Sequence, residues 1–200
     1  MVIHLLAPKD QSKWPEIWHK CYNIWRSSPY KIKLWDDRDI DDLLKEDDKE
    51  FFNTLNLLPS IYKFDYVRYI ILEKFGGAYF DMDVEIVKDF IPLLNLQKNY
   101  LMEGTGGTLV ENSIMVSSSL PIPIWNRFKM FSKRKILENL DKCQSSYNVL
   151  HYVGPWMMTE MLIKKYKKDK DYSILGFEQF GNPYSEISFS KHHQTNTWLP

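Results

Sequence analysis

The pattern of apolar and polar positions is most informative between residues 64 and 83. An apolar stripe at helical spacing is formed there by Phe64, Val67, Ile71 and Phe75. Such a stripe predicts a helix. Gly76 and Gly77 follow, and a glycine can end a helix in the left-handed conformation without a Cβ penalty. The apolar run 78–80 then predicts a short buried strand.

Two carboxylates come directly after this predicted strand. Alternate residues of an extended chain share a face, so Asp81 and Asp83 can point the same way while Met82 points into the core. Two acidic side chains at a strand end form a hard oxygen site of the kind that Mg²⁺ or Mn²⁺ uses when it also holds a substrate diphosphate. The alternative is a strand-end turn in which the acids pair with Lys74 or Lys88.

The rest of the chain alternates between strand and helix patterns. Strands are predicted at 2–6, 30–35 and 98–102, and helices at 14–25, 39–48, 122–133 and from 155 onward. This order predicts an α/β nucleotide-binding fold with ligands at the carboxyl ends of the strands. A lone histidine in an apolar strand, such as His4, is more often a satisfied core residue than a ligand. We also expect Trp14, Trp18 and Trp25, which share a helix face, to be core.

Composition narrows the class of protein. The chain has 200 residues, of which 44% are hydrophobic and 26% charged, and this suits one globular domain over residues 1–200. The formal net charge is zero, with 26 basic and 26 acidic residues, which argues against a nucleic-acid partner. The aromatic content of 15% favours a carbohydrate or nucleotide pocket.

The expected location follows from the absence of targeting signals. The two cysteines, Cys21 and Cys143, have no ligand-like spacing and are predicted to be buried free thiols. Residues 1–8 lack the features of a signal peptide, and no apolar stretch reaches the length of a membrane span. We therefore predict a cytoplasmic protein. The basic segment 164–170 is expected to be solvated, with weak association to an anionic membrane surface as the alternative.

The central segment also resembles a known family. The matching pattern reads Asp65-x-x-Arg68-Tyr69, then Leu72, then Phe75-Gly76-Gly77-x-Tyr79-x-Asp81-x-Asp83. It resembles the signature of glycosyltransferase family thirty-two, which includes fungal initiating mannosyltransferases and bacterial capsule sugar transferases and is related to clostridial glucosylating toxins. The resemblance implies a GT-A fold with a central mixed sheet flanked by helices. It also implies a nucleotide-sugar donor, Mn²⁺ or Mg²⁺, and retaining transfer of a hexosyl group to a hydroxyl of a glycan or protein.

The resemblance assigns roles to residues of the central segment and of the segment 112–117, which resembles the family's Asn-x-Phe-Met-Ala strand. Asp83 would hold the metal, and Asp81 would bind the ribose or a metal-bound water. Asp65 and Arg68 would hold sugar hydroxyls, with Tyr69 beside them at the donor. The alternative for Asp65 and Arg68 is an ordinary ion pair on a helix face. Asn112 would face the donor sugar, or else be a plain turn residue.

The C-terminal segment carries a further similarity. Residues 192–198 resemble the His-His-x-x-x-Ser-Trp that closes the family's active site over the donor. By spacing, His193 and Asn196 would lie nearest the metal, and Trp198 would lie against the leaving group. Residues 153–159 are similar to the family's Thr-Gly-Pro-x-x-Leu-Thr, although Val153 replaces the hydroxyl residue and leaves any donor contact there open.

Two other functions remain as alternatives. A hydrophobic strand followed by Asp81-x-Asp83 is also the first motif of haloacid-dehalogenase-type phosphatases. That class should carry a late acidic pair, and the sequence offers no convincing one. The second alternative is a non-catalytic glycan-binding pseudoenzyme, because the chain is short for a complete transferase.

Overall fold

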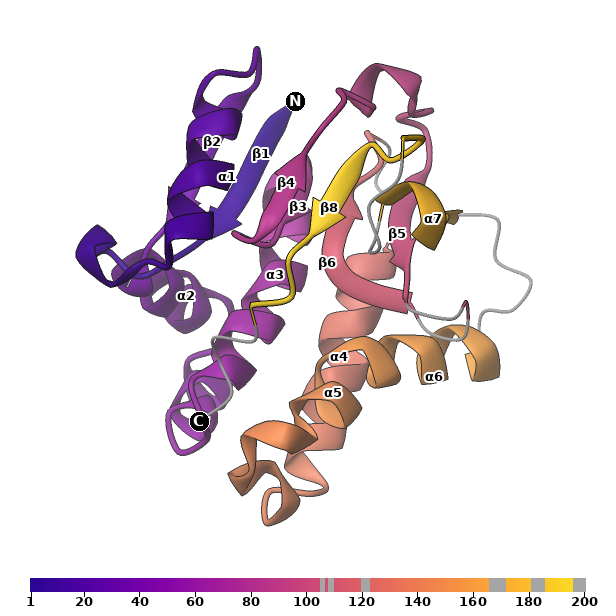
Figure 1. The fold of residues 1–200 in the computed structure, drawn as a ribbon. Helices are drawn as coiled ribbons and strands as arrows, with labels where there is room; N and C mark the ends of the chain where they lie inside the picture. Colours follow the sequence, from indigo (N-terminus) through magenta and orange to yellow (C-terminus); the bar gives the residue numbers. More distant parts are fainter. Residues whose placement is uncertain (105–106, 108–109, 120–122, 166–171, 181–185, 196–200) are drawn as a thin grey trace.

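A six-stranded mixed sheet forms the centre of the protein (Figure 1). The computed structural model describes residues 1–104, 107, 110–119, 123–165, 172–180 and 186–195. The strands of the sheet, in chain order, are β1 (Val2–Leu6), β2 (Lys31–Trp35), β3 (Ala78–Phe80), β5 (Asn99–Glu103), β6 (Val110–Val116) and β7 (Tyr172–Leu175). Their order across the sheet is β2-β1-β3-β6-β5-β7. Strands β2, β1 and β3 are parallel to one another, β6 is antiparallel to both neighbours, and β7 is parallel to β5.

A second, two-stranded sheet connects the centre of the chain to its C-terminal part. Strand β4 (Val84–Ile86) pairs antiparallel with β8 (Ser190–His192). Figure 1 shows β8, in yellow, beside β4 and close to the larger sheet. This pairing places residues 192–195 beside the end of β3, and it therefore contributes to the site described below.

The longer helices match the predicted pattern in order and approximate extent, and two four-residue helices, Val149–Tyr152 and Phe177–Phe180, were not predicted. The helices are α1 (Glu16–Arg26), α2 (Asp37–Leu55), α3 (Ile61–Phe75), α4 (Ile124–Leu137), α5 (Val149–Tyr152), α6 (Pro155–Lys165) and α7 (Phe177–Phe180). Short 3-10 turns occupy Gln11–Lys13, Ile91–Leu93, Lys142–Gln144 and Ser146–Asn148. The prediction of an α/β chain with a central mixed sheet is confirmed. Helix α2 is interrupted at Asp48, whose backbone is not helical (φ −159°, ψ 93°), so the predicted helix 39–48 corresponds to its first part, and a second part with buried apolar residues continues to Leu55.

The large sheet separates two hydrophobic cores, and its strands alternate between them. In β3, Tyr79 faces the core formed with α2 to α6, whereas Ala78 and Phe80 face the core that holds Trp14 and Trp25. The period of two is the one expected for side chains of a strand with both faces covered. Both faces of the short strand β3 are therefore buried.

Helix α3 is buried around more of its circumference than the predicted stripe implies. Tyr66, Tyr69 and Ile70 lie outside the stripe and are fully buried, whereas Phe75, predicted within it, is 52% exposed. Helix α3 contacts α2, α4 and β3, and a helix enclosed in this way is apolar on several faces. The predicted stripe was therefore incomplete, although the predicted helix is confirmed.

Two predictions about single residues are confirmed. His4 is a satisfied core residue, because Trp35 Nε1 donates to its Nδ1 over 3.2 Å and its Nε2 lies 3.0 Å from the carbonyl oxygen of Gly76. Cys21 and Cys143 are buried free cysteines. No helix among the described residues is both long and apolar enough to cross a bilayer. The cytoplasmic location stays a prediction.

Candidate active site

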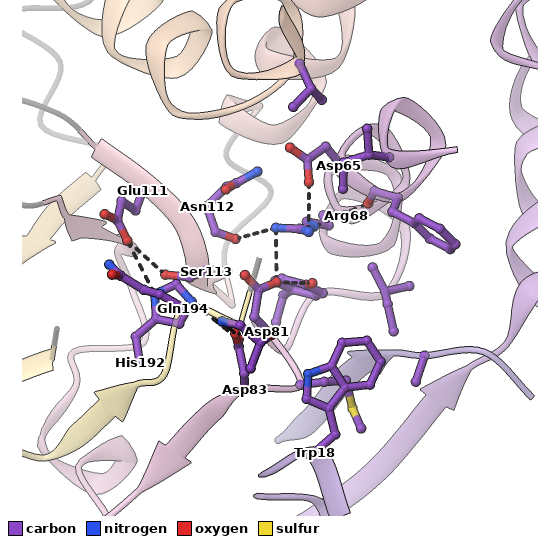
Figure 2. A pocket seen from close by; sticks show the side chains of 18 of the residues that line it. Trp18, Asp65, Arg68, Asp81, Asp83, Glu111, Asn112, Ser113, His192 and Gln194 are labelled. Atoms are coloured by element: carbon purple, nitrogen blue, oxygen red, sulfur yellow. Dashed lines mark hydrogen bonds and ion pairs between the residues drawn. The ribbon is translucent and has the colours of Figure 1, made fainter. Parts of the chain in front are cut away.

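A cavity of about 490 Å³ opens at the carboxyl ends of β1 and β3. Its walls come from the first turns of α1 and α3, from Glu111–Ser113 of β6, and from the starts of α5 and α6. His192, the last residue of β8, and Gln194 and Thr195 beyond it complete the walls. Figure 2 shows these side chains converging from separate elements. Of the residues predicted for the site, Asp65, Arg68, Asp81, Asp83 and Asn112 line this cavity.

Arg68 is the centre of a buried polar network on one side of the cavity. Its Nη2 lies 2.7 Å from Asp65 Oδ1, one helical turn away, and its Nη1 lies 3.1 Å from Asp81 Oδ1. The same Nη1 donates to the main-chain oxygen of Asn112 over 3.2 Å. Because Asp65 and Arg68 are 5% and 8% exposed, this is not an ordinary ion pair on a solvated helix face.

Asp81 is held on one oxygen and available on the other. The Tyr79 hydroxyl donates to Asp81 Oδ1 over 2.5 Å, and Arg68 contacts the same oxygen. Oδ2 makes neither of these bonds. Burial raises the pKa of Asp81 to about 6, although the nearby Arg68 acts to lower it. Asp81 is therefore ionised near neutral pH, and its buried negative charge is unfavourable unless a cation lies beside it.

Asp83 is held by the segment that follows β8. His192 Nε2 lies 3.3 Å from Asp83 Oδ1, and both the main-chain N–H and the hydroxyl of Thr195 donate to Oδ2 over 2.8 Å. Burial would raise the pKa of Asp83, but these bonds lower it to about 2. Burial would also lower the pKa of His192, but the neighbouring carboxylates of Asp83 and Glu111 raise it to about 10.

Three side chains offer a possible metal site. Asp81, Asp83 and His192 each present one ligand atom, and these atoms all lie within 4.8 Å of one another. Carboxylate oxygens suit Mg²⁺ and Mn²⁺, and an imidazole nitrogen suits later divalent metals. A set of two carboxylates and one imidazole fits Mn²⁺ or a similar divalent ion.

The structure places the two consecutive histidines differently from the prediction. His193, expected nearest the metal, directs Nε2 to Glu85 Oε2 at 2.8 Å, and His192 takes the place beside the carboxylates. Side chains of consecutive residues leave extended backbone on opposite faces, so both cannot reach the same site. Lys20 Nζ lies 2.7 Å from the other oxygen of Glu85, which completes a separate cluster outside the cavity.

The remaining predicted residues fall into two groups. Asn112 lines the cavity, and its Nδ2 is buried with no hydrogen-bond partner among the described residues. Tyr69 does not line the cavity, because it is fully buried and its hydroxyl donates to the main-chain oxygen of Val153 over 2.6 Å. Asn196 and Trp198 lie outside the described residues.

Trp18, Glu111 and Thr195 line the cavity although the sequence argument gave them no role in the site. Trp18 was predicted to be core with Trp14 and Trp25, but only those two are buried. Trp18 lies on the first turns of α1, one turn before the buried Cys21. Nothing in the sequence around it therefore indicates that it lines a cavity. Glu111 could have been found from its position directly before Asn112.

Comparison with known proteins finds a family match for the central segment. Residues 15–102 match the family described as "Glycosyltransferase sugar-binding region containing DXD motif". Inositol phosphoceramide mannosyltransferase 1 of Schizosaccharomyces pombe is 35% identical over 100 residues, 47% of this chain and 31% of that protein. Mannosyl phosphorylinositol ceramide synthase SUR1 of Saccharomyces cerevisiae is 29% identical over 159 residues, 78% of this chain and 38% of that protein. The chain thus spans between 31% and 38% of the length of these two curated relatives.

Solved structures share the fold. The PaToxG glycosyltransferase superposes with a TM-score of 0.52 at 18% identity, covering 83% of this chain and 68% of that one. A glycosyltransferase involved in the glycosylation of the major capsid of PBCV-1 superposes with a TM-score of 0.53 at 9% identity. The superposition covers 98% of this chain and 94% of that one. Residues 15–102, which include Asp81 and Asp83, therefore match the family of DXD-containing glycosyltransferase sugar-binding regions, and the chain has the GT-A fold of these glycosyltransferase structures.

Proposed function

We propose that this chain is a metal-dependent, retaining glycosyltransferase that moves a hexosyl group from a UDP- or GDP-sugar to a hydroxyl acceptor. The observation that supports this proposal most directly is the meeting of Asp81, Asp83 and His192 at the end of β3, inside a cavity of about 490 Å³. Such a site can hold a divalent ion and a diphosphate together.

Each side of the cavity has a proposed task. Asp83, Asp81 and His192 hold the metal, which acts when bound as a Lewis acid for the negative charge of the leaving diphosphate. Arg68 and Asp65 bind sugar hydroxyls and fix the orientation of the anomeric carbon. The buried Nδ2 of Asn112 is a donor for a further sugar oxygen, because a buried amide without a partner is costly.

No protein base is assigned in this proposal. In a front-face reaction with retention, the leaving phosphate can itself accept the proton of the attacking hydroxyl. The protein then has to hold the two substrates in the reactive orientation and to exclude water. The buried positions of Arg68 and Asp65 favour the exclusion of water.

The names of the curated relatives favour one choice of sugar and acceptor. Both relatives are named for mannosyl transfer to an inositol-containing ceramide lipid. We therefore propose mannose as the first sugar to test and a phosphoinositol head group as the first acceptor, with a hydroxyl of another glycan or a protein as the alternative. A lipid acceptor would require the protein to work at a membrane surface.

The proposal is tested by calorimetric binding of UDP, GDP and their sugars with and without Mn²⁺. Asp83→Ala should abolish metal-dependent binding, because it removes one of the two carboxylates of the site. The matched control is Asp37→Ala, an exposed aspartate in another Asp-x-Asp sequence at the start of α2. Failure of the wild-type chain to bind any of these nucleotides with metal would overturn the transferase proposal.

Two further assays separate the alternatives. Binding of a sugar nucleotide without transfer or hydrolysis would indicate a pseudoenzyme. Turnover of a generic phosphomonoester would indicate the phosphatase, which needs Asp81 as a free nucleophile.

A further inference from the structure

The two ring nitrogens of His192 face different carboxylates. Nε2 lies 3.3 Å from Asp83 Oδ1, on the side of the proposed metal site. Nδ1 lies 3.6 Å from Glu111 Oε2, just beyond hydrogen-bond distance. Nδ1 is also buried without a hydrogen-bond partner among the described residues. The ion-pair partner recorded for this buried nitrogen is therefore a carboxylate with no assigned role.

Glu111 is held beside His192 by its own strand. It is the second residue of β6, and Ser113, two residues further along the same strand, donates from Oγ to Glu111 Oε2 over 3.4 Å. Figure 2 shows Glu111 and Asp83 on opposite sides of the His192 ring, with Glu111 and Ser113 on β6. The side chains of Glu111 and His192 are 17% and 13% exposed, so water competes little for their contact.

The chemistry of a histidine ligand gives this arrangement a purpose. A histidine binds a metal through the lone pair of a neutral ring nitrogen, so the ring proton must reside on the other nitrogen. Histidine ligands commonly donate that proton to a carboxylate, which fixes the tautomer and the ring orientation. With the proton on Nδ1 and directed at Glu111, Nε2 presents its lone pair toward Asp83 and Asp81. With the proton on Nε2, the ring would present a hydrogen to the metal.

We propose that Glu111 is a positioning residue that accepts a hydrogen bond from Nδ1–H of His192 and thereby presents Nε2 to a divalent metal. The inference rests on the proposed metal-dependent function. It adds to that function a residue outside the Asp-x-Asp sequence and outside the three side chains that meet at the site. A shift of a few tenths of an ångström brings Nδ1 and Oε2 within hydrogen-bond distance.

The experiment is calorimetric titration of the full chain with Mn²⁺ alone, so that no activity is needed. Glu111→Ala should weaken Mn²⁺ binding by roughly 10–100-fold, the usual effect of losing the partner of a histidine ligand. Glu111→Gln should weaken Mn²⁺ binding less than Glu111→Ala does, because the amide oxygen of glutamine can still accept a hydrogen bond from Nδ1–H of His192. The melting temperature of the metal-free protein should be nearly equal for the two variants and the wild type.

The matched control is Glu85→Ala. Glu85 contacts Nε2 of the neighbouring His193 at 2.8 Å, so its removal takes a carboxylate from a histidine of the same segment but away from the site. Mn²⁺ affinity should be unchanged in this variant. An equal loss in Glu85→Ala would mean that any loosening of the β4–β8 pair weakens the site, and it would overturn the role of Glu111.

The remaining outcomes separate the inference from the proposed function. If the wild type binds Mn²⁺ and Glu111→Ala binds it equally well, the role of Glu111 is overturned while the metal site stands. If Glu111→Gln loses as much Mn²⁺ affinity as Glu111→Ala, Glu111 does not act by accepting a hydrogen bond, and the inference is again overturned. If the wild type binds no Mn²⁺, the proposed metal dependence fails, and the inference fails with it.

Discussion

Arg68 and Asp81 come from different elements, α3 and the end of β3, and their side chains meet with Nη1 3.1 Å from Oδ1. The same guanidinium contacts Asp65 at 2.7 Å, so one buried cation holds two carboxylates. This relationship joins the part of the cavity proposed for the sugar to the part proposed for the metal. A donor bound across both would contact groups already fixed relative to each other, which lowers the cost of ordering the site.

The buried position of Arg68 makes a prediction about stability. Arg68→Ala should lower the free energy of unfolding by roughly 3–5 kcal/mol, because it leaves buried carboxylates without their cation. Urea denaturation followed by circular dichroism measures the change. In the control Arg38→Ala, where the side chain is 88% exposed, the loss should be roughly 0.5 kcal/mol or less. Equal losses in the two variants would contradict a stabilising role for the Arg68 network.

The different positions of the two histidines make a second prediction. His192→Ala should weaken Mn²⁺ binding by roughly 10-fold or more, since it removes a proposed ligand. His193→Ala should leave it little changed, because His193 directs its ring to Glu85. Calorimetric titration of both variants with Mn²⁺ decides the matter. A loss confined to His193→Ala would favour the assignment made from sequence over the one in the structure.

The central segment was predictable because its signals are local. A helix, two glycines and a short strand place Asp81 and Asp83 at the cavity and leave Met82 buried, as predicted. The backbone at residues 81–84 is a turn, closed by the N–H of Val84 donating to the main-chain oxygen of Asp81 over 3.0 Å, and not the extended chain that was expected. The choice between His192 and His193 was not predictable in this way. It depends on the register of β8 against β4, in which Val84 lies opposite His192, and this pairing joins residues far apart in the chain.

The wall of the cavity was harder to predict than the two carboxylates at its centre. Trp18 shares a helical face with Trp14 and Trp25, and periodicity alone assigns all three to the core. Trp18 instead lines the cavity, because its position on α1 places it at the carboxyl end of β1. The role of Tyr69 was likewise hidden, since its hydroxyl bonds to Val153, 84 residues away. Such contacts depend on packing that no short sequence pattern encodes.

His4 makes a prediction about acid sensitivity. Burial lowers its pKa to about 4, from an ordinary value of 6.5. The folded state therefore favours the neutral imidazole. The corresponding contribution to the free energy of unfolding, about 3 kcal/mol, is present above pH 6.5 and is lost as the pH falls toward 4. His4→Gln removes the titration while its amide can still accept from Trp35 and donate to Gly76.

Urea denaturation at pH 7 and pH 5 tests this prediction. The wild type should lose stability between the two pH values, and His4→Gln should lose less. His19→Gln serves as the control, because His19 is a partly exposed histidine of α1. An unchanged pH dependence in His4→Gln would show that another group causes the acid sensitivity.

The two glycines after α3 offer a matched pair of variants. Both have positive φ, +62° at Gly76 and +79° at Gly77. A Cβ at Gly76 would meet nothing within 4 Å, whereas one at Gly77 would lie 2.4 Å from the main-chain oxygen of Val2. Strand β1 pairs with both β2 and β3, so that oxygen cannot move without disturbing the sheet.

Gly76→Ala should therefore lower the free energy of unfolding by roughly 1–3 kcal/mol through backbone strain alone, and Gly77→Ala should lower it clearly more. Gly77→Ala should also weaken metal-dependent nucleotide binding, because β3 begins at the next residue and carries Asp81 at its end. Urea denaturation and nucleotide calorimetry on the two variants measure both effects. Equal destabilisation would mean that the close approach of Gly77 to Val2 does not limit the side chain. Normal nucleotide binding by folded Gly77→Ala would mean that the site tolerates a shift of β3 against β1.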